Sequence, residues 1–516
     1  MRHASRGCVL GRTNTRPGIG APCVLASWGV PRDIHRGHFP DRHLVLFPTA
    51  TFAIFFVVVL PLSWLLMPRG ERWRPFIIAA SYVFYSAWDW RFVFLLAFST
   101  VWNQLFARAI YARTNVAQRK LLLALAVAGD VALLGYFKYY DFFVSSTHNV
   151  FTLVGLDVPL SIRSIVLPVG ISFFTFMAIS YVVDTYRGDW QPVSFGKFAA
   201  YLSFFPHLVA GPIVRPGELL PQFETPRDPR YVDTARAFFL IGTGLFKKVV
   251  IANYLASAIV DPVFGAPNQH SSLETLVGIY GYAVQIYADL SGYTDMAIGF
   301  ALLLGFRFPQ NFDSPYAAVS IQDFWRRWHM TLSRWLRDYV YIPLGGNRGS
   351  RLFTYRNLML TMLIGGLWHG AGWTFVAWGA IHGSALVAER WWRDRPGYVE
   401  RPLTGLRRAW HRFLTFQIVC FAWIFFRADS FADARDVIVR LFTAWGQASP
   451  LVTGGALLAI AVGIGSQYLP PRFPLMVMAR FSRLPVPAQA VVLSFGLLLA
   501  NAMGPEGVAP FIYFRF

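Results

Sequence analysis

Long apolar runs recur along this sequence, and they limit its fold more than any other feature does. Two examples are FAIFFVVVLPLSWLLM at residues 52–67 and LLLALAVAGDVALLG at residues 121–135. Such runs approach the roughly 20 apolar residues that a helix needs to cross a bilayer. Hydrophobic residues make up 55% of the 516 residues and charged residues only 14%. Because a soluble chain of this length needs more surface charge, we predict an all-α, polytopic membrane protein.

The apolar runs predict about 10–12 transmembrane helices. The candidate spans are residues 46–67, 75–89, 91–112, 121–140, 164–183, 235–260, 273–304, 357–373, 374–392, 409–427, 451–469 and 487–503. Basic residues fill the loops 68–74 and 108–120. Positively charged loops stay in the cytoplasm, so these two loops are predicted to lie inside.

The loop after the fourth predicted span has fewer clustered basic residues than the two inner loops. Residues 138–163 carry Lys138 and Arg163 spread over a long stretch, which predicts an outer loop. Residue 46 then starts on the outer side. The preceding residues 1–45 are polar and Arg-rich, without the apolar core of a signal peptide. We interpret them as a disordered or non-native N-terminal extension, followed by one membrane domain over residues 46–516.

The net charge of +20 comes largely from basic residues in short loops, which is how membrane proteins set their orientation. No separate nucleic-acid-binding module is visible, so no nucleic-acid partner is predicted. The three cysteines, Cys8, Cys23 and Cys420, form no CxxC pair. Neither a metal site nor a disulfide framework is therefore indicated, and no P-loop or dinucleotide motif occurs.

Two segments are neither regular spans nor regular loops. Residues 195–223 mix prolines and glycines with aromatics, and broken backbone at membrane depth is tolerated only inside protein or beside a watery cavity. We predict a re-entrant segment there, next to a central cavity. Residues 323–346, read as one helix, place Arg326, Ser333 and Arg337 opposite an apolar stripe formed by Trp325, Trp328, Leu332, Trp335, Leu336 and Tyr339. This pattern predicts an interfacial helix.

Two histidines stand out in these apolar surroundings. His369 lies in GGLWHGAGW, where its neighbours at helical spacing are Gly365, Gly366 and Gly372. The glycines allow either close helix packing or a cavity in which a substrate reaches the imidazole. Ionisable groups within membrane spans are costly, which favours a functional role. His329 lies at the border of the interfacial helix, where it either faces lipid headgroups or takes part in catalysis.

Other ionisable residues fit structural roles better. His382 and His207 are interpreted as hydrogen-bonded core histidines. Asp289 and Asp295 are six residues apart, which is about 240° around a helix, so they do not form a paired acid and base. Each could pair with an arginine of residues 323–337 or bind an ion during transport, and pairing is the favoured reading.

Several long motifs resemble those of the membrane-bound O-acyltransferase family, in the bacterial branch with the alginate O-acetyltransferase membrane subunit and the D-alanyl transfer protein of teichoic acids. The resemblance runs from about residue 46 to residue 516. The matching stretches are LPVGISFFTFMAISYVVDTYRG, FFPHLVAGPIVRPGELLPQF, YADLSGYTDMAIG, FPQNFDSPYAA, FWRRWHMTLSRWLRDYVYIPLGGNR, NLMLTMLIGGLWHGAGWTFVAWGAIHG and PFIYFRF.

The resemblance assigns His369 to the histidine that characterises the family and His329 to its second characteristic position. Both are therefore predicted to be catalytic, without a decision on which one removes the proton. Predicted substrate contacts come from nearby polar residues, namely Arg326, Arg327, Ser333, Asp289 and Asn311.

The resemblance also implies the reaction. It implies transfer of an acetyl group from a cytoplasmic donor, with acetyl-CoA as donor and no bound cofactor, for O-acetylation of an exported, alginate-like polysaccharide. The implied location is the bacterial inner membrane, with a periplasmic esterase-like acetyltransferase as partner. Two alternatives remain. One is acylation of peptidoglycan, cellulose or another envelope polymer, and the other is a transporter or flippase that uses the histidines and aspartates as a proton relay.

Overall fold

The computed structural model describes residues 47–485 except 157, 159–164, 400, 401 and 471, together with a few residues between 487 and 494. Within this part of the chain every regular element is helical and no β-strand occurs. The predicted all-α class is confirmed. The predicted extension over residues 1–45 and most of the predicted span 487–503 lie outside the described residues.

The N-terminal half of the described chain begins with six long helices, which shorter helices and irregular turns follow. The α-helices are α1 Ala50–Leu66, α2 Gly70–Ser86, α3 Arg91–Ala112, α4 Val116–Leu134, α5 Tyr140–Leu153, α6 Ile171–Arg187, α7 Phe195–Ser203, α8 Phe205–Leu208, α9 Pro216–Leu219, α10 Thr234–Leu245, α11 Asn253–Leu255 and α12 Asp261–Gly265. The irregular turns are η1 Gly135–Tyr139, η2 Leu220–Phe223, η3 Pro229–Tyr231, η4 Phe246–Ala252, η5 Ala256–Val260 and η6 Pro267–Gln269, of which η1, η4 and η5 are π-helical.

The C-terminal half contains the longest α-helical element and the two histidines that are predicted to be catalytic. Its α-helices are α13 Ser272–Leu303, α14 Ile321–Arg327, α15 Met330–Leu336, α16 Arg351–His369, α17 Trp373–Arg393, α18 Gly405–Arg427, α19 Phe431–Thr443, α20 Gly454–Gly465 and α21 Arg472–Ser482. The irregular turns are η7 Pro315–Ala317, the π-helical η8 Arg337–Tyr341 and η9 Ser466–Tyr468.

The described helices carry apolar side chains on their outer faces, as a membrane protein requires. Ile54, Val57, Phe94 and Leu105 of α1 and α3 are all more than half exposed, which suits contact with lipid rather than water. Three helices are long and apolar enough to cross a membrane, Arg91–Ala112, Val116–Leu153 and Gly405–Arg427, and α1 is a shorter apolar helix. The predicted total of crossings stays a prediction.

The predicted outer loop at residues 138–163 is wrong over most of its length. Helices α4 and α5 join through the π-helical turn η1 into one continuous helix, Val116–Leu153. Lys138 and Asp141 interrupted the apolar pattern and made the helix appear to end. The extra residue in the π-turn instead rotates the following residues, so that Lys138 points into the protein and the helix continues.

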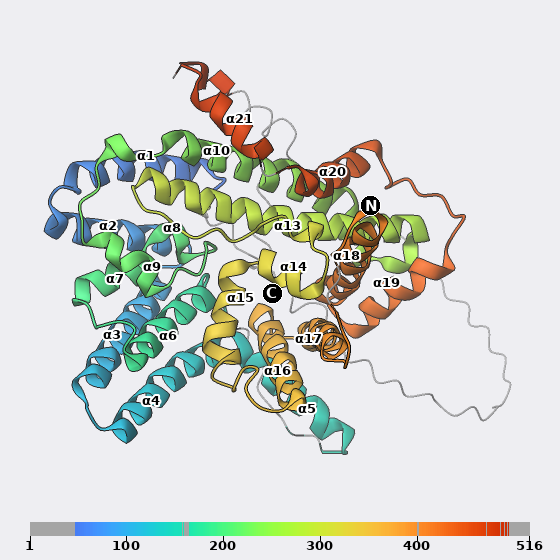
Figure 1. Ribbon diagram of the computed structural model, residues 1–516, viewed down its shortest axis with the longest axis horizontal. Helices are drawn as coiled ribbons and strands as arrows, with labels where there is room; N and C mark the ends of the chain where they lie inside the picture. The colour runs from blue at the N-terminus through green and yellow to red at the C-terminus, as the bar shows by residue number, and fades with distance from the viewer. Residues whose placement is uncertain are drawn as a thin grey trace, which may run out of the picture.

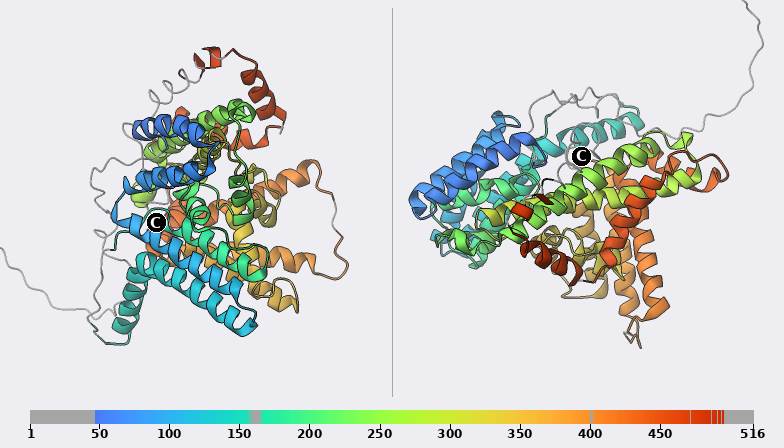
Figure 2. Two further views of the ribbon diagram at one scale, coloured as in Figure 1. Left: turned by 90° about the vertical axis from the view of Figure 1, so that its left-hand side faces the viewer. Right: turned by 90° about the horizontal axis from the view of Figure 1, so that it is seen from above.

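The helices fall into two groups that meet around α13 (Figure 1). The blue and cyan helices of the first quarter of the chain gather at the left-hand end in Figure 1 and in the right-hand view of Figure 2. Helices α16–α19 lie at the other end, and the short helices α14 and α15 lie between the two groups. This central position puts the residues around His329 next to both groups.

The buried helix α13 packs closely against α10 because each contributes a glycine at the contact. A Cβ atom on Gly244 would lie 2.6 Å from the carbonyl oxygen of Gly292, and a Cβ on Gly292 would lie 2.7 Å from the carbonyl oxygen of Gly244. Only residues without a side chain allow two helix backbones to approach this far. The contact places the π-turn η4 alongside the middle of α13.

Two lysines of η4 neutralise the two aspartates of α13. Lys247 Nζ lies 2.7 Å from Asp295 Oδ2, and Lys248 forms a buried ion pair with Asp289. The prediction of structural pairing is confirmed, but the predicted arginine partners from residues 323–337 are wrong. The glycine contact between α10 and α13 brings the lysines closer than any arginine of that segment, and periodicity alone does not show it.

Candidate active site

The segment with His329 is broken rather than being the single interfacial helix that the sequence predicted. Helix α14 ends at Arg327, and α15 starts at Met330. His329 lies between them in left-handed backbone conformation, with φ 41° and ψ 54°. Residues other than glycine rarely adopt positive φ, and such strain gathers at functional sites.

Asn311 holds the chain immediately after this break. Its carbonyl oxygen accepts a hydrogen bond from the Met330 amide at 2.8 Å. Its side-chain oxygen accepts from the Thr331 amide at 3.1 Å and from the Thr331 hydroxyl group at 2.9 Å. The same hydroxyl accepts from the amide of Ile213 at 3.0 Å. Tertiary hydrogen bonds therefore replace the helical ones that a continuous helix would have made, which explains the break.

His369 is the last residue of α16, and the chain leaves the helix abruptly. Gly370 is extended, with φ −157° and ψ 151°. The imidazole is 3% exposed and lies among aromatic rings. The ring centres of Trp368, Trp378 and Phe426 are 4.9, 5.0 and 5.2 Å from that of His369. The imidazole is thus fixed at the end of a long helix in surroundings that exclude water.

The two predicted catalytic histidines both lie next to the ring of Trp368. The ring centre of Trp368 is 5.9 Å from that of His329 and 4.9 Å from that of His369. Both histidines are buried, at 2% and 3% exposure. Two helix ends from separate parts of the chain therefore bring two imidazoles into one small region. This juxtaposition is the main feature of the candidate active site.

The glycines around His369 support helix packing rather than open space. A Cβ atom on Gly366 would collide with the backbone of Phe375 and approach Gly379 of α17, and a Cβ on Gly379 would lie 2.5 Å from the carbonyl oxygen of Met362. A Cβ on Gly365 would lie 3.2 Å from the side chain of Leu336. The contacts of Gly366 and Gly379 support the close-packing interpretation, since the backbones of α16 and α17 fill the space between them.

One cavity at this end of the molecule lies away from the two histidines. Its volume is about 80 Å³, and charged and polar side chains of α14, α16 and α17 line it, among them Gln322, Thr354, Glu389, Arg390 and Arg393. The central cavity expected beside His369 stays a prediction.

The five predicted substrate contacts have mixed surroundings. Arg326 is exposed on α14, whereas Arg327 forms an ion pair with Asp323 at 2.8 Å. Ser333 donates to the carbonyl oxygen of Trp328 at 3.1 Å. The two remaining residues are the ion-paired Asp289 and the clamping Asn311, described above. Four of the five thus have structural partners, and their contact with substrate stays a prediction.

The other two candidate histidines, His207 and His382, make fewer hydrogen bonds than the sequence suggested. His207 has one ring nitrogen 3.0 Å from the carbonyl oxygen of Tyr201. Both ring nitrogens of His382 are buried without a hydrogen-bond partner among the described residues. The expectation of a hydrogen-bonded core histidine is therefore wrong at His382, whose ring instead lies 4.8 Å from that of Trp378.

A contact that the sequence did not indicate holds the last turn of α16. Lys138 Nζ donates to the carbonyl oxygens of Trp368 at 2.5 Å and His369 at 3.1 Å. The neighbouring Tyr139 hydroxyl donates to the carbonyl oxygen of Leu367 at 2.6 Å. The sequence contains one signal for this contact, a lysine inside an apolar run that is too long for one span. The same lysine also fits a loop, which is what the sequence pattern predicted.

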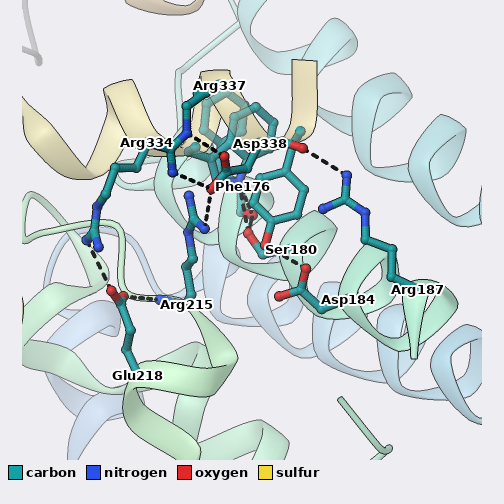
Figure 3. Close-up of polar contacts among 11 residues, drawn as sticks. Phe176, Ser180, Asp184, Arg187, Arg215, Glu218, Arg334, Arg337 and Asp338 are labelled. Atoms are coloured by element: carbon teal, nitrogen blue, oxygen red, sulfur yellow. Dashed lines mark hydrogen bonds and ion pairs between the residues drawn. The ribbon is translucent and has the colours of Figure 1, made fainter. Parts of the chain in front are cut away.

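A cluster of arginines and carboxylates surrounds the turn after α15 (Figure 3). Asp338 lies 2.7 Å from Arg215 and 2.6 Å from Arg337. Arg334 pairs with Glu218 at 3.1 Å, and Arg187 donates to the carbonyl oxygen of Asp338 at 2.8 Å. Three arginines thus contact Asp338 and the fourth pairs with Glu218, close to the stacked rings of Phe176 and Trp335.

The charges in this cluster determine the state of its central carboxylate. Burial of Asp338 opposes its ionisation, but hydrogen bonds and charge from Arg337 and Arg215 outweigh that effect, so the pKa of Asp338 lies below its ordinary value. The cluster adjoins the end of α6, where Arg119 of α4 donates to the carbonyl oxygen of Tyr186 at 2.6 Å. It therefore lies on the same side of the membrane as the loop 108–120, the side predicted to be cytoplasmic.

Comparison with known proteins gives the context for this geometry. The model of the membrane-bound O-acyltransferase family matches residues 86–397, a range that includes both His329 and His369. The probable alginate O-acetylase AlgI of Pseudomonas aeruginosa is 44% identical over 398 residues, which are 76% of this chain and 73% of that protein.

Relatives with other named substrates match as well. The peptidoglycan O-acetyltransferase of Helicobacter pylori is 38% identical over 426 residues, covering 77% of this chain and 79% of that protein. The teichoic acid D-alanyltransferase of Bacillus subtilis is 23% identical over 417 residues, covering 74% of this chain and 98% of that protein. The names of these relatives share transfer of an acyl group to a cell-envelope or secreted polymer.

Proposed function

Since this chain belongs to the membrane-bound O-acyltransferase family, we propose that it transfers acetyl groups to an exported polysaccharide and that His369 and His329 carry the reaction. The observation that supports this assignment best is the position of the two buried imidazoles, which both lie next to the ring of Trp368. Isolated core histidines have no reason to meet at two helix ends, whereas proton transfer during acyl transfer needs such groups close together.

The reaction has a simple balance of bonds and protons. An acceptor hydroxyl oxygen attacks the carbonyl carbon of an acetyl thioester, the new C–O bond forms, and the C–S bond breaks. One imidazole takes the hydroxyl proton and returns it to the leaving thiolate. Negative charge builds on the carbonyl oxygen in between and needs a hydrogen-bond donor, which is the role we propose for the second imidazole.

The proposed donor is acetyl-CoA from the cytoplasm. Its phosphate groups carry several negative charges, and arginines bind phosphate through paired N–H groups. The arginine cluster around Asp338 lies on the predicted cytoplasmic side, and the guanidinium group of Arg337 is 59% exposed. Arg187 is also exposed there. We propose that these two arginines meet the anionic part of the donor.

The proposed acceptor is an alginate-like polysaccharide outside the cytoplasm. The AlgI relatives support this choice by their names, and the peptidoglycan O-acetyltransferase relative makes an envelope polymer the second candidate. We propose a multi-pass location in the bacterial inner membrane and a periplasmic esterase-like partner that completes transfer to the polymer. Cellulose is a further member of the same acceptor class.

The transporter alternative loses its main support in the structure. A proton relay through Asp289 and Asp295 needs carboxylates that can exchange protons, yet both are in ion pairs with lysines of η4. Both carboxylates thus have a structural role, since they join α13 to η4. We therefore retain the acyltransferase assignment alone.

The test is a deletion of this gene in its own bacterium, followed by chemical analysis of two polymers. Deletion should remove ester-linked acetyl groups from the exopolysaccharide, and the wild-type gene should restore them. Loss of acetyl groups from peptidoglycan alone would replace the alginate-like acceptor with the second candidate. Unchanged acetyl content of every envelope polymer would contradict the proposed function.

A further inference from the structure

The last turn of α16 lacks the usual means of ending a helix. The final carbonyl groups of any helix have no partner within the helix, and a glycine in left-handed conformation normally allows the following amides to cap them. Gly370 follows His369 but is extended, and its amide makes only a long 3.4 Å contact with the carbonyl oxygen of Gly366. The carbonyl groups of residues 367, 368 and 369 therefore need other partners.

Two neighbouring side chains of a different helix supply those partners. Tyr139 donates to the carbonyl oxygen of Leu367, and Lys138 donates to those of Trp368 and His369. Both residues belong to the π-turn η1. In a regular helix adjacent side chains point about 100° apart. The wider π-turn changes that direction, and such turns often occur at functional sites.

The cost of this arrangement makes an incidental contact a poor explanation. A lysine in a membrane-spanning helix is expensive, and an unpaired carbonyl group in the membrane interior costs several kcal/mol. The two features compensate each other here, because Lys138 is half-buried and its ammonium group uses two of its three protons on α16. The ammonium group also lies 5.9 Å from the centre of the Trp368 ring, the ring that both histidines contact.

We propose that Lys138, assisted by Tyr139, is a positioning residue for the reaction, because it fixes the end of α16 and with it the imidazole of His369. The proposal rests on the proposed function of His369. Catalysis depends on placing the reacting groups within narrow limits, and a displacement of about 1 Å can lower the rate roughly 10²-fold. Release of three carbonyl groups at the helix end allows a displacement of that size.

The first experiment measures acetylation in cells that carry variants of Lys138. Lys138→Met removes both hydrogen bonds of the ammonium group and should lower polymer acetylation roughly 10²-fold at equal protein level. Lys138→Arg keeps a cationic donor and should restore much of the activity. Tyr139→Phe removes one donor of three and should cause a smaller loss. Lys120→Met, at an exposed site on the same continuous helix, is the matched control and should keep wild-type activity.

The second experiment measures the helix end itself, independently of activity. Amide hydrogen exchange of the purified protein should become faster in the peptide that covers residues 366–373 in Lys138→Met, and remain at the wild-type rate in Lys120→Met and Lys138→Arg. Faster exchange throughout the protein would mean general unfolding and would contradict a positioning role.

The outcomes separate this proposal from the proposed function. If His369→Ala abolishes acetylation while Lys138→Met retains both activity and slow exchange, the function stands and the positioning role is wrong. If His369→Ala retains acetylation, the proposed function of His369 fails, and the exchange measurement still shows whether Lys138 holds the helix end.

Discussion

The two helix ends that carry the histidines are built in opposite ways. His329 lies in strained, left-handed backbone between two helices of seven residues each, and Asn311 holds the residues that follow it. His369 ends a helix of 19 residues without backbone strain, and Lys138 holds it from another helix. Residues distant in the chain hold both ends, but only the short segment at His329 also carries strain in its own backbone.

The two ends also differ in the kind of energetic cost that they carry, which is backbone strain at His329 and a charged group at His369. Positive φ at a residue other than glycine costs about 1–3 kcal/mol, and the hydrogen bonds around Thr331 must offset it. At the other histidine the expensive element is the membrane-embedded ammonium group of Lys138. Both devices bring an imidazole to the same indole ring, so both are expected to matter for one reaction.

The largest expected effect tests whether the two ends form one site. His369→Ala and His329→Ala should each lower acetylation about 10²–10⁴-fold, because each removes a group that handles a proton or charge in the transition state. The double variant should lose no more than the worse single variant, since residues that act as a unit are not additive. Acetyl content per unit of polymer, at equal membrane levels of protein, measures this. Losses that multiply would mean two independent sites.

The next prediction separates the strained backbone of His329 from its side chain. His329→Gly should abolish most activity like His329→Ala, but the glycine variant should be the more stable by about 1 kcal/mol, because glycine adopts positive φ freely. Thermal unfolding in detergent compares the two proteins. Equal stability of both variants would contradict the strain assigned to this position.

Substitutions of two adjacent glycines test the packing beside His369. Gly366→Leu should destabilise the protein by about 3 kcal/mol, because a side chain there meets the backbone of Phe375. Gly365→Ala should cost less, since its Cβ meets only the movable side chain of Leu336. The unfolding midpoints of the two purified variants decide the order. A stable, inactive Gly366→Leu protein would revive the cavity interpretation.

The last prediction concerns the clamp at the other end. Asn311→Ala leaves the buried amide and hydroxyl of Thr331 without their acceptor, which should cost about 1–3 kcal/mol. Asn311→Asp keeps the acceptor oxygen and serves as the comparison. The unfolding midpoints of the two variants in detergent provide the measurement. If both variants unfold alike, the side-chain oxygen of Asn311 does not hold the break.

The sequence predicted the parts of this site that depend on local pattern. Apolar runs gave the all-α membrane class, and His369 stood out because an imidazole in such a run is costly. The resemblance to the family, confirmed by the comparisons, directed attention to His329. Periodicity over residues 323–346 also identified the buried rings of Trp328 and Trp335 correctly.

The remaining features depend on contacts between residues far apart in the chain. The break at His329 arises from hydrogen bonds to Asn311, which no helical pattern contains. Lys138 looked like a loop residue because its acceptors lie on α16 and are visible only after folding. The glycines before His369 suited open space and close packing equally, and the position of α17 decides between them.

The most direct test of the central claim is the acetyl content of exported polymer from a deletion strain that carries single histidine variants. His369→Ala, present in the membrane at wild-type level, should leave the polymer without detectable ester-linked acetyl groups. His148→Ala, on the membrane helix α5, should restore the wild-type content. Wild-type acetylation by a well-expressed His369→Ala protein would contradict the assignment of His369 to catalysis and leave it as a packing residue of α16.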